Sequence, residues 1–250
     1  MLSILNNSNP WLIGVGLNAI LLALVALSPK QLLTLAGIIH AWFLGVIIWA
    51  TLGWPGYAIV AFYFIVGSAV TRIGLAQKEA AGIAEKRSGA RGPENVWGSA
   101  LTAALCAVGT LFVDPPLQQL LILGYVASFS TKLADTTASE VGKAYGKRTF
   151  LITTLKPVSP GTEGAVSWEG TLAGIVAAGA IALLGWGVGL ITLWGVLWSV
   201  LAAFVATNIE SLIGATLQEK YTWLTNEVVN IINTLIGGAI AIALAFILIN

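Results

Sequence analysis

Residues 131–171 hold a large share of the side chains in this chain that could take part in chemistry. This polar segment lies between two long apolar runs. It contains the acids Asp135, Glu140 and Glu163 and five basic residues, although charged residues make up only 9% of the composition. Asp135 comes directly after an apolar run, where an idle charge would be costly to desolvate. We therefore expect the function to lie in this segment and assign Asp135 a part in it.

Helical spacing arranges part of this segment into two neighbouring stripes. Asp135, Ser139, Gly142 and Gly146 follow the spacing i, i+4, i+7 and i+11, which places a carboxylate, a hydroxyl and two positions without side chains on one helix face. The adjacent stripe adds one acid and two lysines, namely Glu140, Lys143 and Lys147. Such a patch suits a phosphate chain with Mg²⁺, because Mg²⁺ is usually held by one or two carboxylates together with phosphate oxygens.

Several common catalytic signatures do not occur in the sequence. The run GKAYGK at 142–147 is not a Walker A loop, which needs four residues between its glycines and a hydroxyl residue directly after the lysine, where Arg148 stands. There is neither a Ser/His/Asp arrangement nor a GxGxxG dinucleotide turn. Hydrolase and dehydrogenase interpretations therefore have no residues to support them.

The second half of the polar segment is predicted to bind an anion. The run GTEGAVSWEGT at 161–171 follows Lys156 and leads into an apolar run, so that Thr162, Glu163 and Ser167 approach the N-terminus of a helix. Free backbone N–H groups and the helix dipole both favour negative charge at such a position. Together with Lys156, this run predicts a phosphate-binding site.

An earlier polar stretch, before the fourth apolar run, offers further cations. Arg91 lies next to Gly89 and Gly92, which would let an anionic group approach closely, and Lys78 lies on a helical stripe of small and polar residues. Asn95 is expected to cap the helix that follows. The alternative interpretation of this stretch is a solvated amphipathic helix and a loop.

Asparagines extend into the last apolar run. Asn226, Asn230, Asn233 and Gly237 follow the spacing i, i+4, i+7 and i+11, and unpaired amides in lipid would cost several kcal/mol each. These side chains must therefore face protein, water or a ligand. We expect a lined cavity, and the alternative is hydrogen bonding between helices. Other polar candidates just before this run are Asn208, Glu210 and Gln218.

The composition is that of a multi-spanning membrane protein. Hydrophobic residues make up 57% of the chain, the mean hydropathy is +0.89, and the apolar stretches approach the roughly 20 residues needed to cross a bilayer. A net charge of +1 gives no reason to expect a nucleic-acid partner. Cys106 and His40 each lie alone in an apolar run, which excludes a disulfide framework and a Cys-based metal site. We expect one integral-membrane domain, 1–250, without a cleaved signal.

The apolar pattern predicts an all-α transmembrane bundle of about eight spans, with seven as the alternative number. All 12 Lys and Arg residues, and ten of the 11 acids, fall in the gaps after the first, third, fifth and seventh spans. The positive-inside rule makes that side cytoplasmic, so we expect a cytoplasmic active face, in a prokaryotic plasma membrane or an internal, thylakoid-like one. The predicted spans are 11–29, 33–52, 56–72, 96–113, 117–133, 170–186, 190–206 and 229–249.

Motifs distributed over the whole chain carry a family resemblance. They are GIAEKRSGARGPENVWGS at 82–99, ADTTASEVGKAYGK at 134–147, the pair Lys156 and Pro157, GTEGAVSWEGTLAG at 161–174, and ATNIESLIGATLQ with TNEVVNIINTLIGG near the end. In these motifs the chain resembles the integral-membrane phytyl-phosphate kinases of the tocopherol pathway and their prokaryotic relatives. It is more distantly similar to the CTP-dependent polyprenol and phytol kinases.

This resemblance implies transfer of the γ-phosphoryl group of CTP, or of another nucleoside triphosphate, to phytyl phosphate or a similar isoprenyl monophosphate. The product would be the diphosphate, and Mg²⁺ is the expected cofactor. An acceptor that is already a phosphate has no hydroxyl proton to lose, so the lack of a general-base histidine is no objection. We expect the isoprenyl tail to lie between spans in the bilayer. The chain length, the preferred nucleotide and the oligomeric state are left open.

Under this interpretation the candidate residues fall into four groups. The expected catalytic residues are Asp135 and Lys156. The expected metal ligands are Asp135, Glu140 and Glu210. Nucleotide and phosphate binding is assigned to Lys78, Arg91, Asn95, Ser139, Gly142, Lys143, Gly146, Lys147, Thr162, Glu163 and Ser167. Acceptor binding is assigned to Asn208, Gln218, Asn226 and Asn230.

Two other functions remain as alternatives. A cytidylyltransferase would couple CTP to a lipid phosphate with loss of pyrophosphate. A carrier for an anionic metabolite would use the polar stripes as a translocation path, although the charged residues lie almost entirely at one face.

Overall fold

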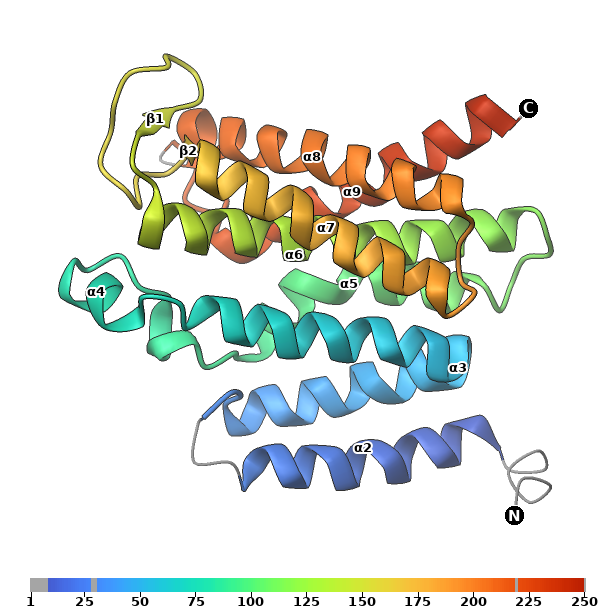
Figure 1. The fold of residues 1–250 in the computed structure, drawn as a ribbon. Coiled ribbons are helices and arrows are strands. Elements are labelled where there is room, and N and C mark those ends of the chain that lie inside the picture. Colours follow the sequence, from blue (N-terminus) through green and yellow to red (C-terminus); the bar gives the residue numbers. More distant parts are fainter. Residues whose placement is uncertain (1–8, 28–30, 219, 250) are drawn as a thin grey trace.

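The computed structural model describes residues 9–27, 31–218 and 220–249, and this part of the chain is mostly helical (Figure 1). The α-helices are α2 (Pro10–Ala26), α3 (Leu35–Thr71), α4 (Leu75–Ala80), α5 (Pro93–Gly109), α6 (Leu117–Tyr145), α7 (Trp168–Gly187), α8 (Leu193–Ile213) and α9 (Asn226–Ile249). The shorter elements are the 3₁₀ turn η1 (Lys86–Gly89), the strands β1 (Thr149–Leu151) and β2 (Ala165–Ser167), and the π-helical turn η2 (Gly214–Gln218).

Helix α3 reverses direction at Gly53 and so consists of two halves. Gly53 has φ 63° and ψ −157°, a backbone conformation that glycine adopts readily. Pro55 cannot donate a backbone hydrogen bond to the preceding turn, which further opposes an uninterrupted helix. Figure 1 shows the chain folding back on itself at this point. The prediction of two separate segments, 33–52 and 56–72, is confirmed.

The other predicted spans also coincide with helices, and successive helical segments run in opposite directions (Figure 1). Part of the first predicted span, together with Lys30 and Glu219 of the predicted charge bias, lies outside the described residues. Within the described part, four helices are long and apolar enough to cross a membrane, and Pro10–Ala26 is a shorter apolar helix. These four are Leu35–Thr71, Trp168–Gly187, Leu193–Gln218 and Asn226–Leu248. The helical membrane class is confirmed, while the number of crossings and the cytoplasmic side stay predictions.

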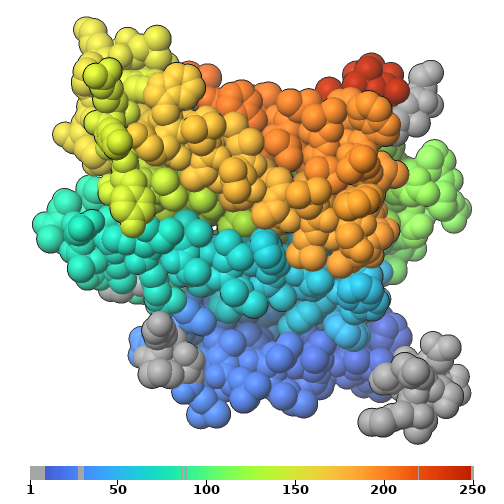
Figure 2. Space-filling model, in the orientation of Figure 1, coloured from blue at the N-terminus to red at the C-terminus, as the bar shows by residue number. Residues whose placement is uncertain are grey.

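The two ends of the bundle differ in character. Helix α4 and the β1–β2 segment lie at one end, and the start of α2 and the end of α9 lie at the other (Figure 1). In the space-filling view the β1–β2 segment projects beyond the body of the bundle, above the projecting α4 segment (Figure 2). The connections between predicted spans that carry most of the charged residues therefore lie together at one end of the molecule.

Helix α6 is the central helix and contacts α3, α5, α7, α8 and α9. Small residues on its neighbours allow close approach: a Cβ on Gly174 of α7 would lie 2.9 Å from the carbonyl oxygen of Ala134, and one on Gly237 of α9 would lie 2.0 Å from Oγ1 of Thr131. Phe129 of α6 is fully buried among aromatic and aliphatic side chains. Because α6 continues to Tyr145, the polar residues after its apolar run lie on the same rigid helix.

The β1–β2 hairpin is an addition to the helical bundle that the sequence did not predict. Thr149 pairs with Ser167 and Leu151 pairs with Ala165 in an antiparallel ladder, and the connecting loop spans 152–164. Each strand has three residues, which is too short for an alternating hydrophobic pattern to be recognised in a sequence. The hairpin holds its loop beside the N-terminus of α7.

Candidate active site

A cavity of about 670 Å³ lies at the end of the bundle that carries α4 and the hairpin. Its walls come from the second half of α3, the connection between α4 and α5, helices α5 to α9, the turn η2, and the β1–β2 hairpin with its loop. The acids in the wall are Glu85, Asp135, Glu140, Glu163, Glu210 and Glu227. The basic residues in the wall are Arg87, Arg91, Lys132 and Lys143. A cavity of this size is in the range of small-molecule sites.

A buried ion pair between Lys132 and Asp135 lies deepest in the α6 wall. The ammonium of Lys132 is 2.6 Å from Oδ2 of Asp135 and 2.8 Å from Oδ1 of Asn230 on α9. Both charged residues are 7% exposed. Asp135 lies ten residues before the C-terminal end of α6 at Tyr145, or about 15 Å along the helix. Charges this far inside an apolar bundle are costly unless they are paired, and in membrane proteins they generally mark a function.

One carboxylate oxygen of Asp135 remains available to a ligand. Among the described residues, none donates a hydrogen bond to its Oδ1, although Asp135 forms part of the cavity wall. Glu210 of α8 faces the same cavity, close enough to Asp135 and Lys132 for their charges to interact. No hydrogen bond from a described residue reaches the Glu210 carboxylate. Two acids from different helices therefore present oxygens to one space.

The third predicted metal ligand, Glu140, is engaged by lysines. Its Oε2 forms a hydrogen-bonded ion pair with the ammonium of Lys78, and its Oε1 lies 3.7 Å from Lys143. Lys78 also donates to the carbonyl oxygen of Thr71 at 2.9 Å and is 1% exposed. This pair joins α4 to α6. Lys78 is thus enclosed behind the cavity wall, which corrects its assignment to phosphate binding.

The three predicted metal ligands do not converge as one set. No three Asp, Glu, His or Cys side chains among the described residues are placed to hold a metal ion together. The separation follows from the pairing above, because Glu140 is drawn towards Lys78 and Lys143 while Asp135 is drawn towards Lys132. Asp135 and Glu210 are the acids left with oxygens towards the cavity.

Arg91 lines the cavity and is held by both its backbone and its side chain. Its backbone pairs with the segment before α3, through N–H to the carbonyl of Leu32 and C=O to the N–H of Thr34, each at 3.0 Å. Its guanidinium donates to the hydroxyl of Tyr63 at 2.9 Å and lies over that ring, with 5.0 Å to the centroid. The Tyr63 hydroxyl in turn donates to Ser99 at 2.9 Å. Arg91 is a fixed cation in the wall, as a phosphate contact would require.

Two helices, α5 and α7, start at the cavity rim. The Asn95 side chain accepts from the N–H of Gly92 at 3.0 Å and so caps α5, and it also accepts from Arg87 at 3.0 Å. Ser167 is the N-cap of α7 and accepts from the N–H of Gly170 at 3.1 Å. Helix α5 begins at Pro93 with Gly92 as its N-cap, so Asn95 is not the N-cap that the sequence led us to expect but the third helical residue, whose side chain reaches back to the N-cap N–H. Thr162 and Glu163 of the loop line the same cavity.

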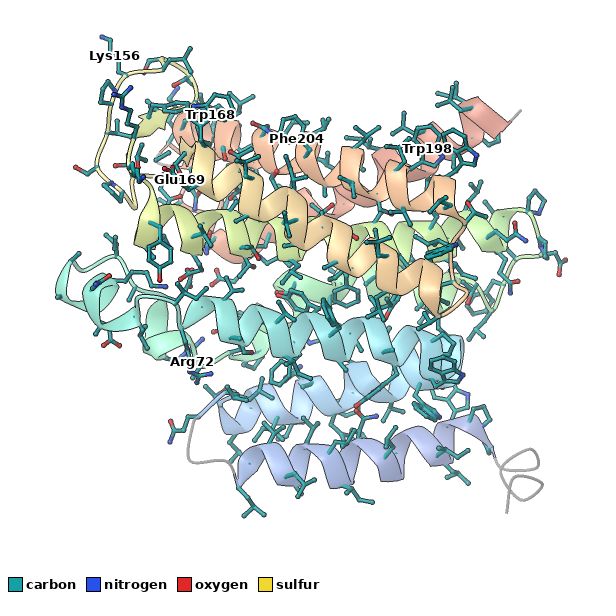
Figure 3. The ribbon with its side chains drawn as sticks, viewed as in Figure 1. Arg72, Lys156, Trp168, Glu169, Trp198 and Phe204 are labelled. Carbon is teal, nitrogen blue, oxygen red and sulfur yellow. The ribbon has the colours of Figure 1, made fainter. Side chains whose placement is uncertain are left out.

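Four other predicted residues lie outside the cavity wall. Lys156 and Lys147 are exposed, and the labelled Lys156 side chain points away from the bundle in Figure 3. The carbonyl of Lys156 accepts from the N–H of Leu151 at 2.9 Å, at the base of the hairpin loop. Gly146 ends α6 and packs against Ser167, where a Cβ would lie 3.1 Å from Oγ. Asn208 lies in a smaller adjoining crevice.

The remaining candidates do line the cavity. They are Ser139, Gly142, Lys143, Gln218, Asn226 and Asn230. The amide oxygen of Gln218, in the π-helical turn, is buried without a hydrogen-bond partner among the described residues. The predicted asparagine stripe therefore faces a cavity at Asn226 and Asn230. Asn233 is fully buried, and neither of its amide atoms has a partner in the described part of the chain.

Three residues of the cavity wall, Lys132, Arg87 and Glu227, were given no site role by the sequence analysis. Lys132 precedes Asp135 by three positions, a spacing that allows an ion pair on a helix, and a lysine inside an apolar run is itself a functional signal. Arg87 has φ 55° and bonds both Glu94 and Asn95. No pattern in the sequence distinguishes Arg87 or Glu227 from other polar loop residues.

Fold and cavity together define a helical integral-membrane protein with a charged cavity between its helices. The chain belongs to the integral membrane protein family DUF92, whose profile matches residues 18–238. It is 71% identical to an uncharacterized membrane protein of Synechocystis sp. over 94% of this chain and 91% of the relative. It is 46% identical to protein VTE6, chloroplastic, of Arabidopsis thaliana, over 87% of this chain and 67% of the relative.

A third relative is archaeal. It is an uncharacterized membrane protein of Methanocaldococcus jannaschii, 33% identical over 82% of this chain and 83% of the relative. No solved structure matches the chain. These relationships confirm the family resemblance found in the motifs.

Proposed function

We propose that the protein is an isoprenyl-phosphate kinase. It transfers the γ-phosphoryl group of a nucleoside triphosphate, with CTP favoured, to phytyl phosphate or a similar isoprenyl monophosphate. The motifs that resemble phytyl-phosphate kinases and the 46% identity to VTE6 support this assignment. The observation that carries it is the Lys132–Asp135 pair at the deep end of a cavity inside a membrane bundle. A lipid substrate explains why such a cavity lies between apolar helices.

The reaction needs positioning and charge neutralisation more than acid–base chemistry. An oxygen of the acceptor phosphate attacks the γ-phosphorus. The bond from that phosphorus to the bridging oxygen breaks, and CDP leaves with the electron pair. Lys132 at the deep end and Arg91 and Lys143 in the wall are the cations available to offset the negative charges that this approach brings together. The acceptor has no hydroxyl proton to remove, so no general base is required.

The carboxylates of the cavity fit an ion that arrives with the nucleotide. Asp135 and Glu210 each present oxygen to the cavity without a described hydrogen-bond donor, and Mg²⁺ is commonly held by one or two carboxylates plus substrate phosphates. We propose these two residues as its ligands. When bound, Mg²⁺ would neutralise phosphate charge next to acids that would otherwise repel the nucleotide. Asn226 and Asn230 are proposed to orient the acceptor phosphate.

The topology of the proposed enzyme follows from the charge bias of its loops. We propose that the end bearing the cavity faces the cytoplasm of a prokaryotic plasma membrane, or of an internal, thylakoid-like one. Both substrates would then be reached from that side, the nucleotide from water and the lipid phosphate from the inner leaflet.

The test is turnover by purified protein in detergent or nanodiscs. CTP, ATP, GTP and UTP are each combined with phytyl, geranylgeranyl and farnesyl monophosphate in the presence of Mg²⁺, and products are resolved by mass. The expected products are a nucleoside diphosphate and an isoprenyl diphosphate. Pyrophosphate with a CDP-lipid would identify a cytidylyltransferase instead. Transport into sealed vesicles without nucleotide turnover would identify a carrier.

A further inference from the structure

A narrow crevice continues the cavity sideways between α6, α7 and α8. Its accessible volume is about 40 Å³. Its wall shares Ala138, Val166, Thr171, Thr207 and Ser211 with the cavity, so the two spaces lie side by side against the same residues. The crevice therefore adjoins the charged cavity and lies between α6, α7 and α8.

The polarity of the crevice changes along its length. At the cavity end, Thr171 of α7 and Ser211 of α8 contribute hydroxyl groups. Further along α7 the wall is formed by Ile175 and Ala178, and further along α8 by Phe204. On both helices the change runs from the cavity towards the middle of the apolar segment. An amphiphile with its head in the cavity would meet polar groups first and apolar groups afterwards.

The outer surface beside the crevice is apolar and open. On α7, Val176 is 73% exposed, and on α8, Phe204 is 42% exposed. Phe204 is labelled in Figure 3 on the outer side of the bundle. In a membrane bundle such a surface faces lipid. A hydrocarbon chain that leaves the cavity through the crevice would therefore enter the bilayer directly.

We propose that this crevice binds the first part of the acceptor's isoprenyl chain and guides the remainder into the bilayer between α7 and α8. This inference rests on the proposed function and specifies where the lipid substrate enters. The crevice does not suit the nucleotide, whose polar atoms would lack partners against alanine, isoleucine and phenylalanine side chains. Asn208 would then lie beside the isoprenyl chain, because it lines the crevice. Its amide already donates to the carbonyl of Phe204 at 2.7 Å, so this N–H group is satisfied within α8.

Two adjacent residues of α7 provide a matched pair of variants. Ile175 lines the crevice, whereas its neighbour Val176 points outward and is not part of the wall. Ile175→Trp fills the crevice, and Val176→Trp adds the same side chain to the outer surface. We expect Ile175→Trp to reduce kcat/KM for phytyl phosphate by about tenfold or more relative to methyl phosphate, which carries no isoprene unit, as expected when a chain loses one or two methylene contacts. Val176→Trp should leave the ratio of the two substrates unchanged.

A binding experiment separates the location of the chain from turnover. Phytyl monophosphate with a diazirine on its first isoprene unit is photolysed with wild-type protein in nanodiscs, and labelled peptides are identified by mass spectrometry. Labelling within Trp168–Gly187 and Leu193–Ile213 that unlabelled phytyl monophosphate displaces is the expected result. Labelling elsewhere, or labelling that is not displaced and so reflects ordinary bilayer lipid, overturns the inference.

The two proposals fail in different ways. If no nucleoside triphosphate supports turnover but displaceable labelling falls on α7 and α8, the kinase assignment is wrong and the lipid-phosphate crevice stands. If turnover occurs but Ile175→Trp retains the wild-type preference for the long chain, the crevice assignment is wrong and the kinase stands. Thr207→Phe, at the junction of the two spaces, provides an independent second variant with the same expected loss.

Discussion

The ammonium of Lys132 lies 2.6 Å from Oδ2 of Asp135, one helical turn further along α6, and both side chains are buried in the bundle. Asn230 on α9 accepts a second hydrogen bond from the same ammonium at 2.8 Å. This arrangement fixes the Asp135 carboxylate with one oxygen paired and the other towards the cavity. The position of the Lys132 ammonium and of the Asp135 carboxylate thus depends on a contact between α6 and α9, two helices that are far apart in the chain.

Asp135→Asn is expected to lower kcat by roughly two to three orders of magnitude, comparable to the removal of one preorganised electrostatic group from an active site. The amide oxygen can still accept from Lys132, as does Asn230, so the loss of stability should be smaller than in Lys132→Met and the protein should remain folded and monodisperse in detergent. Asp114→Asn is the matched control, because Asp114 is exposed in the connection between α5 and α6, and this connection lies at the opposite end of the bundle from α4 (Figure 1). Wild-type turnover in Asp135→Asn would remove Asp135 from the mechanism.

Lys132→Met should be both inactive and less stable than the wild type, since it leaves the Asp135 charge buried without its partner. Breaking a buried pair in this way costs about 3–5 kcal/mol. The double variant Lys132→Met with Asp135→Leu removes both charges and should recover thermal stability without recovering turnover. Thermal unfolding in detergent and product formation measure the two effects separately. If the double variant also regains activity, the pair has only a structural role.

We expect Glu140 to contribute to the stability of the fold and Glu210 to Mg²⁺ binding. Glu140→Gln weakens the buried link to Lys78 and should chiefly lower the unfolding temperature. Glu210→Gln should leave the unfolding temperature nearly unchanged, because no described residue bonds this carboxylate. It should raise the Mg²⁺ concentration needed for half-maximal turnover by about tenfold or more. Titration with Mg²⁺ after EDTA treatment checks this, and equal Mg²⁺ requirements in wild type and Glu210→Gln would contradict it.

Lys156→Ala should change kcat/KM by less than about threefold, because substitutions at exposed positions away from a site are usually worth about 0.5 kcal/mol or less. Lys143→Ala, in the cavity wall, should instead raise KM for the nucleotide. Steady-state kinetics with CTP and phytyl phosphate compare the two. A large loss in Lys156→Ala would indicate that the hairpin loop closes over the cavity during turnover.

Much of the fold was predictable because each helix is coded locally. Apolar runs of membrane length are separated by glycine, proline and charged residues, and Gly53 with Pro55 marks the reversal within α3. Residue type alone indicated that Asn95 takes part in starting α5, but it did not show that Gly92 is the N-cap and that Asn95 lies inside the first turn. The short β1–β2 hairpin was not predictable, since three-residue strands carry no periodic signal.

The candidate site was predictable only in part. Helical spacing correctly grouped Asp135, Ser139 and Gly142 on one wall, because neighbours on a helix face follow from sequence distance. The spacing could not show that Glu140 is taken up by Lys78, 62 residues earlier in the chain. Nor could it show that the loop after β1 turns Lys156 outward.

The sequence by itself determined that this is a helical membrane protein whose charged residues gather in a few segments, because hydrophobicity and helical period are local properties. The tertiary structure alone decided which of those charges pair with one another and which face the cavity. That choice depends on how α4, α6, α8 and α9 pack, and therefore on distances between residues that no local pattern records. The crevice beside α7 also could not be read from the sequence, since it exists only where three helices meet.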